Sequence, residues 1–222
     1  MEELKISVSE EIGTVSGLWR HPEESLALLV LAHGAGAGMH HEFMESLADA
    51  LAAEQIATLR YQFPYMEAGK KRPDRAEVAQ QAIRAALSKA GALAPELPLF
   101  AGGKSFGGRM TSQLAAGGDL ATVKGLIFFG FPLHPSGRPG MARADHLMQV
   151  AHPMLFLQGT RDRLAEVDLI EAVVQRLPQA TLRFLEDGDH SFRTLKRTGI
   201  SREQAIAWLA ARSCEWIDEL IS

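Results

Sequence analysis

Short runs of apolar residues alternate with longer amphipathic stretches along most of the 222-residue chain. Runs that are apolar at every position are typical of strands buried on both faces of a parallel sheet. We expect such strands at residues 26–32, 57–61, 97–101, 125–129 and 154–157.

Three further segments alternate between apolar and polar residues, which is typical of strands with one solvent-facing side. Residues 4–8 and 12–19 flank the polar pair Glu10-Glu11 and predict an antiparallel pair at a sheet edge. Residues 181–185 also alternate, so we expect this strand to lie near a sheet edge.

The gaps between strands carry helical patterns. Phe43, Leu47 and Leu51 recur every four residues and predict one helix with a buried stripe. Residues 76–90 are rich in Ala and Gln and predict a second helix, which Gly91 is expected to cap at its C-terminus.

Two more helices are expected in the second half of the chain. Residues 164–177 are amphipathic and stop before Pro178. The last helix opens at Ser201, which has capping-box spacing to Gln204. Its apolar positions are Ile206, Leu209, Trp216 and Leu220.

A hairpin followed by repeated strand–helix units predicts an α/β fold: a mostly parallel sheet of about eight strands with helices on both faces. We expect residues 1–222 to form a single domain, because the sequence contains no repeat or linker. Strands and helices occupy nearly the whole chain, so no insertion is long enough for a cap domain. Ligands bind such sheets beyond the carboxyl ends of the strands.

The composition, with 46% hydrophobic and 23% charged residues, favours a globular protein, which we expect in the cytoplasm. A net charge of −4 argues against nucleic-acid binding. The lone cysteine, Cys214, excludes an internal disulfide and suits a reducing compartment. The polar N-terminus is unlike a signal peptide, and the apolar run 26–32 is far shorter than the roughly 20 residues that span a bilayer. A homo-oligomer is compatible with the sequence, which does not specify one.

The strand at 97–101 runs into a glycine-rich turn. Gly103, Ser105 and Gly107 fit G-x-S-x-G, the nucleophile elbow, in which a strained strand-to-helix turn lifts a serine hydroxyl above the sheet. We expect small residues at the two glycine positions because larger ones would crowd the serine backbone. Lys104 is expected to be solvated, with contact to an anionic substrate as the alternative.

Two nucleotide-binding motifs share parts of this pattern and fail. A P-loop ending in Gly-Lys-Ser needs a glycine where the chain has Pro98, inside the preceding strand. The glycine-rich loop after residues 26–32 lacks G-x-G-x-x-G, because Met39 stands three positions beyond Gly36. A glycine turn with a buried capping serine remains the alternative to a nucleophile.

A serine nucleophile needs a base and an acid, which follow it in the order acid, histidine in this type of fold. His190 alone among the histidines lies in the final quarter, in the loop after strand 181–185. Asp162 is the first carboxylate after strand 154–157 and would accept the Nδ1 proton of His190. The alternatives are a surface histidine, and an aspartate that caps the helix over 164–177.

Acyl transfer also needs donors for an oxyanion. The backbone N–H groups of Phe106, directly after the serine, and Ala35 are the candidates, with Gly34 adjacent to Ala35. His33, at the start of the same loop, is expected to order it through hydrogen bonds.

The remaining histidines do not predict a metal site. No pair among them has the i, i+4 spacing of a helical zinc site, and no cysteine accompanies them. We therefore expect neither a metal nor a cofactor. The histidines concerned are His33, His40, His41, His134, His146 and His152.

Four segments together resemble the α/β-hydrolase superfamily, in its small dienelactone-hydrolase-like branch. They are residues 33–36, 103–107, 158–162 and 188–190, in the family's order. The resemblance implies an α/β-hydrolase fold, a Ser105–Asp162–His190 triad and hydrolysis of carboxylic esters or related acyl groups. Dienelactone hydrolases proper use a cysteine nucleophile, which this chain replaces with serine.

Any lid must come from residues 61–75 or 131–152, which are rich in Pro, Gly and aromatic or basic residues. The candidate substrate-binding residues are His33, Gly34, Lys104, Tyr65 and His134. We interpret the chain as a serine esterase or thioesterase with a shallow, open site for small soluble substrates. The alternatives are a non-catalytic interaction module with the same fold and a serine peptidase acting on short peptides.

Overall fold

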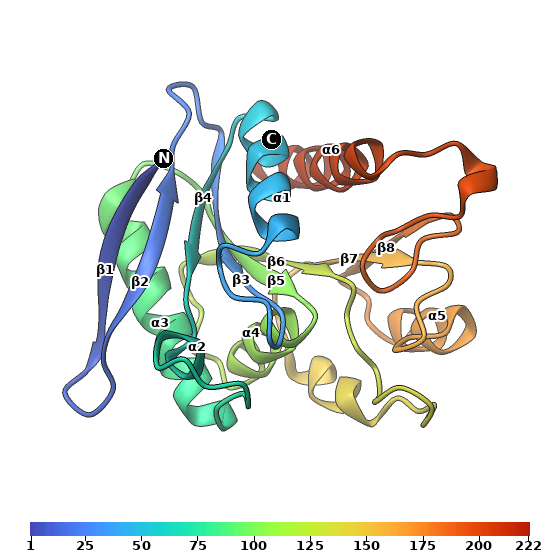
Figure 1. Cartoon of the computed structure of the whole chain (residues 1–222), viewed down its shortest axis with the longest axis horizontal. Helices are drawn as coiled ribbons and strands as arrows, with labels where there is room; N and C mark the ends of the chain where they lie inside the picture. Colours follow the sequence, from blue (N-terminus) through green and yellow to red (C-terminus); the bar gives the residue numbers. More distant parts are fainter.

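The computed structural model describes all 222 residues and contains one eight-stranded sheet. Its strands lie in the order β1-β2-β4-β3-β5-β6-β7-β8 (Figure 1). They are β1 (Glu2–Ser9), β2 (Gly13–Arg20), β3 (Ala27–Ala32), β4 (Ile56–Tyr61), β5 (Leu99–Lys104), β6 (Val123–Phe129), β7 (Met154–Gly159) and β8 (Ala180–Leu185).

Six α-helices and two 3₁₀ helices connect these strands. The α-helices are α1 (Glu42–Ala53), α2 (Pro64–Glu67), α3 (Ala76–Leu93), α4 (Phe106–Ala116), α5 (Val167–Val174) and α6 (Arg202–Ile221). The 3₁₀ helices are η1 (Ala142–Gln149) and η2 (Lys196–Thr198). None of the helices is both long and apolar enough to cross a membrane.

The topology confirms the predicted α/β sheet. β1 and β2 form an antiparallel pair, and β2 pairs antiparallel with β4. All strands from β3 to β8 run parallel, so their carboxyl ends meet along one edge of the sheet. The alternating strand β8 lies at an edge, as predicted.

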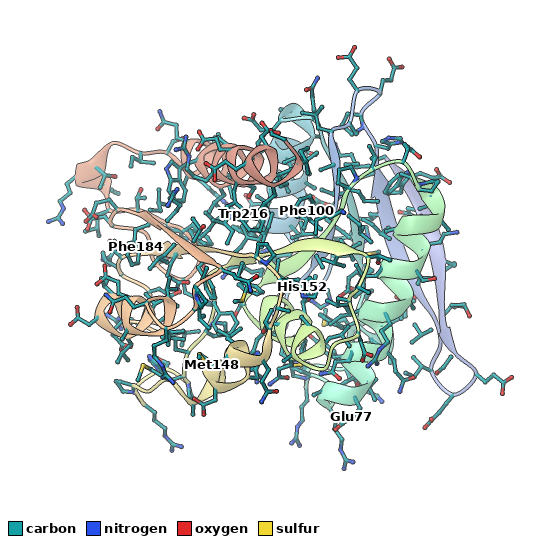
Figure 2. The ribbon with its side chains drawn as sticks, turned by 180° about the vertical axis from the view of Figure 1, so that it is seen from behind. Glu77, Phe100, Met148, His152, Phe184 and Trp216 are labelled. Atoms are coloured by element: carbon teal, nitrogen blue, oxygen red, sulfur yellow. The ribbon has the colours of Figure 1, made fainter.

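Strand β3 shows how the sheet divides the core into two layers. Leu28 and Val30 pack on one face with α2, α3, α4 and α5, whereas Leu29 and Leu31 pack on the other with α1 and α6. Figure 1 shows α1 and α6 together on one side of the sheet. Figure 2 shows Trp216 of α6 beside Phe100 of β5, and their rings meet edge to face with centroids 6.0 Å apart.

Three predicted helix ends are wrong. Helix α3 continues through Gly91 to Leu93, because Gly91 keeps a helical backbone, and Ala94 is the residue that ends it. Helix α5 begins at Val167 rather than 164, since the carbonyl of Leu164 accepts from the N–H groups of Leu133 and His134 instead of from a helical turn. It also ends at Val174 rather than 177, with Gln175 as its C-cap.

Helix α6 matches its predicted start, and three of its four predicted apolar positions join the core. Ser201 and Gln204 form the expected capping box, with each side chain bonded to the other's backbone. Leu220, however, is 38% exposed in the last turn and lies outside the core that Trp216 joins.

Candidate active site

Ser105 lies at the carboxyl edge of the sheet, between the end of β5 and the start of α4. Its φ of 49° and ψ of −109° are a conformation that non-glycine residues rarely adopt. Such strain at the junction of a strand and a helix is the geometry of a nucleophile elbow. The structure therefore supplies the turn that the G-x-S-x-G pattern predicts.

The flanking glycines are required by close contact with β3. A Cβ atom on Gly103 would lie 2.3 Å from the carbonyl oxygen of Ala32, and one on Gly107 would lie 2.6 Å from that of His33. Both distances are far below van der Waals contact, so neither position tolerates a side chain without movement of the backbone. The atoms nearest to both positions belong to Ala32, the last residue of β3, and His33, the residue after it.

Ser105, His190 and Asp162 form a chain of hydrogen bonds. His190 Nε2 lies 2.9 Å from Ser105 Oγ, and His190 Nδ1 lies 2.7 Å from Asp162 Oδ2. Because an ionised carboxylate only accepts, Nδ1 carries the proton and Nε2 is free to accept from the serine hydroxyl. Burial, and secondly the charge of Lys104, hold the pKa of His190 below its usual value, against the opposing effect of Asp162. His190 is thus a neutral acceptor at neutral pH.

Asp162 is fully buried, and both of its oxygens are hydrogen-bonded. Oδ2 also accepts from Gln158 Nε2 at 2.6 Å, and Oδ1 accepts from Leu164 N at 2.8 Å. Gln158 Oε1 in turn accepts from Phe131 N at 2.9 Å, which fixes the amide. The apolar run 154–157 does not by itself predict a role for Gln158. An amide directly after a buried strand is the sequence feature that could indicate one.

The alternative role of Asp162 as a helix cap does not match the structure. The residue that precedes α5 is Glu166, whose side chain makes no capping bond. The bond from Leu164 N closes a short turn before the helix begins.

The loop that follows β3 is fixed by the segment after β4. His33 Nδ1 lies 2.8 Å from Gly34 O, and His33 Nε2 accepts from Phe63 N at 3.1 Å. The Tyr65 hydroxyl accepts from Gly36 N at 3.1 Å. Burial lowers the pKa of His33 to about 4, so the imidazole is neutral and its two bonds define a single tautomer. These contacts agree with the expectation that His33 orders the loop.

Two backbone N–H groups beside Ser105 have no acceptor within the protein. They belong to Ala35 and to Phe106, the first residue of α4. The loop is close to the serine, since a Cβ atom on Gly34 would lie 3.9 Å from Ser105 Cβ. Free N–H groups next to a serine hydroxyl can bind an anionic oxygen.

A pocket of about 410 Å³ opens over Ser105. Its lining contains basic residues but no Asp or Glu, and one of the basic residues, Arg202, is paired with Glu42 outside the pocket. Residues that line it include Gly34, Ala35, Lys104, His190, Arg193 and Arg202. Neither of the segments 61–75 and 131–152, from which a lid was expected, contributes a lining residue.

Three candidate substrate-binding residues lie outside this pocket. His33 and Tyr65 are buried and hold the loop after β3. His134 is also buried, and its ring contacts Pro135 O and the carboxylate of Glu166. All three side chains therefore make contacts within the protein instead of lining the pocket. Of the five candidate substrate-binding residues, Gly34 and Lys104 line it.

The prediction that Lys104 is solvated is wrong. Its side chain is buried, and its ammonium donates to the carbonyl oxygen of His190 at 2.6 Å. Phe43 of α1 and Phe192 cover it, and neither is near Lys104 in sequence.

A larger groove of about 880 Å³ lies at the other end of β5, lined by Arg84, Pro98 and Asp119 among others. It contains no histidine or cysteine and lies away from the carboxyl ends of the strands. Nowhere in the chain do three or more His, Cys, Asp or Glu side chains come together as a metal site would require.

Comparison with known proteins places the chain in a family. Similar solved structures include an alpha-beta serine hydrolase homologue from Coxiella burnetii, with 21% identity, 96% of each chain covered and a TM-score of 0.75. A dienelactone hydrolase from Anabaena variabilis has 20% identity over 99% of this chain and 98% of its own, with a TM-score of 0.76. A serine hydrolase without a lid from Xanthomonas campestris has 22% identity over 95% and 94%, with a TM-score of 0.70. The family profile described as "Alpha/beta hydrolase domain" matches residues 25–218, and the chain belongs to this family.

Proposed function

We propose that the protein is a serine acyl hydrolase that cleaves carboxylic esters or thioesters of small substrates. The observation that carries the proposal is the hydrogen-bond chain from Ser105 Oγ through His190 to the buried Asp162. A serine hydroxyl is a weak nucleophile at neutral pH, and a neutral imidazole within hydrogen-bond distance provides the base it needs.

Ser105 is the proposed nucleophile. Its Oγ attacks the acyl carbonyl carbon while its proton passes to His190 Nε2. Asp162 keeps the Nδ1 proton of His190 directed away from the serine and stabilises the imidazolium that forms. Its two further hydrogen bonds, from Gln158 and Leu164, restrict the rotation of the carboxylate.

The tetrahedral intermediate carries an oxyanion, for which the N–H groups of Ala35 and Phe106 are the proposed donors. Both lack an acceptor within the protein. His190 then returns its proton to the leaving alcohol or thiol, and an acyl-enzyme remains on Ser105. Water activated by His190 attacks this ester, releases the acid and restores the serine.

The volume of the pocket favours small acyl groups. A volume of about 410 Å³ is near the lower end for ligand pockets, which span roughly 300–1,000 Å³. The similar solved structures include a dienelactone hydrolase and a serine hydrolase without a lid. These likenesses support acyl hydrolysis in an open site without identifying the substrate.

The test is a series of nitrophenyl esters and acyl thioesters of increasing chain length, assayed with wild type and Ser105→Ala. We expect turnover of short esters by the wild type and a loss of about 10⁴-fold or more in the variant. Near-normal turnover by Ser105→Ala would overturn the mechanism. No turnover of any ester or thioester by the folded wild type would favour the interaction module.

A further inference from the structure

Lys104 is the buried cation nearest to the proposed base. It is the last residue of β5, and its Nζ donates to His190 O at 2.6 Å. The same ammonium lies 5.5 Å from the ring centroid of Phe192 and 5.9 Å from that of Phe43. These two rings stack, with centroids 5.9 Å apart. In the folded protein, one carbonyl oxygen and two aromatic rings therefore replace most of the water around the ammonium.

Gly130 provides the space that brings the ammonium close to the imidazole. A Cβ atom on Gly130 would lie 2.9 Å from Lys104 Nζ and 3.5 Å from His190 Nδ1. The cation and the ring therefore both border the space that a side chain at position 130 would occupy. No side chain larger than glycine's would fit between them without displacing one.

Lys104 contacts the loop that carries His190 rather than the hydroxyl of Ser105. That loop leaves β8, the edge strand, and the bond from Lys104 ties its main chain to β5 in the centre of the sheet. We propose, resting on the proposed function, that Lys104 is a positioning residue: it anchors the main chain of His190 to β5, aligns the imidazole with Ser105 and places a positive charge beside the ring.

The charges around His190 are consistent with this role. Asp162, from the loop after β7, and Asp189, beside His190, favour the imidazolium, whereas Lys104 disfavours it. Arg193 and Arg202 line the same pocket. Burial lowers the pKa of Lys104 itself to about 8. The ammonium is therefore largely charged at pH 7 and loses its charge as the pH rises through 8.

The test compares wild type with Lys104→Met, which keeps an unbranched side chain and removes both the charge and the donor. Turnover of a neutral nitrophenyl ester is measured from pH 5 to 9. We expect kcat at pH 7 to fall by about 10- to 100-fold, because a small displacement of a catalytic group has such effects. KM should change little, and the acid limb of kcat/KM should move to higher pH, since removal of the cation raises the pKa of His190.

Two further variants separate the roles of charge and fold. Lys104→Arg retains the charge and should keep the acid limb at the wild-type position. Lys124→Met removes an exposed lysine from the adjacent strand β6 and should leave both kcat and the pH profile unchanged. If Lys104→Met does not fold, Lys104→Gln replaces it and should show the same displacement of the acid limb.

An NMR titration of the His190 ring in the same proteins requires no activity. A higher ring pKa in Lys104→Met than in wild type supports the proposal. An unchanged ring pKa together with wild-type kcat would overturn it, while leaving the role of Ser105 intact. If the wild type hydrolyses no ester, the proposed function fails, and the titration alone then decides whether Lys104 acts on His190.

Discussion

The Tyr65 hydroxyl accepts a hydrogen bond of 3.1 Å from the backbone N–H of Gly36. This bond ties the short helix α2 to the loop that carries the proposed oxyanion donor Ala35. Tyr65, 29 positions after Gly36 in the chain, therefore helps to fix the conformation of this loop. Removal of the hydroxyl tests whether that shape matters for catalysis.

Tyr65→Phe should destabilise the fold by about 1 kcal/mol, because Gly36 N–H loses its acceptor. It should also reduce kcat for a short ester roughly tenfold, because the loop is less well held. Tyr61→Phe is a matched control, since the Tyr61 hydroxyl is buried without any partner. That control should be at least as stable as wild type and fully active. Equal effects of the two substitutions would contradict the role given to Tyr65.

Gly103→Ala should prevent the close approach of β5 and β3, because its Cβ would lie 2.3 Å from Ala32 O. We expect a loss of about 2 kcal/mol or more in the free energy of unfolding, with loss of activity. Gly91→Ala, in the last turn of α3 with open space around it, should instead stabilise the protein by about 0.5 kcal/mol. Urea unfolding of both variants makes the comparison, and a harmless Gly103→Ala would refute the steric argument.

Asp162→Asn should lower kcat about 10⁴-fold, because an amide in place of the carboxylate no longer fixes the His190 tautomer. The fold should persist, since the amide oxygen can still accept a hydrogen bond. Asp168→Asn alters an exposed carboxylate in the first turn of α5 and should leave kcat unchanged. Steady-state kinetics at pH 7 distinguish the two, and a fully active Asp162→Asn would remove this residue from the mechanism.

The stability of the fold should fall as the pH is lowered from 6.5 towards 4. His33 has its pKa lowered from 6.5 to about 4 by burial, so the unfolded chain binds a proton that the folded chain excludes. At pH 5 this one group removes about 2 kcal/mol of the stability present at neutral pH. Urea unfolding at pH 7 and pH 5 should show a smaller difference for His33→Ala than for wild type. An identical difference would show that His33 does not titrate in this way.

Much of the architecture could be predicted from apolar runs, because a strand buried on both faces leaves no polar positions. The apolar run 26–32, for example, exceeds β3 (Ala27–Ala32) by one residue. The end of β5 was misplaced because Gly102 and Gly103 have the composition of a turn. In the structure they continue the strand, packed closely against β6 and β3.

The surroundings of the site were harder to predict. The order of Ser105, Asp162 and His190 follows from strand exits, which local sequence reveals. The burial of Lys104 depends on Phe43 and Phe192, which only the tertiary fold brings to it. Lysine is usually exposed, so no local pattern indicated that this one would bond to His190 O.

The central claim is that Ser105 is a nucleophile activated by His190. The most direct measurement is reaction of the folded protein with a fluorophosphonate, followed by identification of the modified residue by peptide mass spectrometry. We expect a single adduct on Ser105 in the wild type, no adduct in Ser105→Ala and greatly slowed labelling in His190→Ala. A folded wild type that remains unlabelled, or an adduct on another residue that persists in Ser105→Ala, would contradict the account.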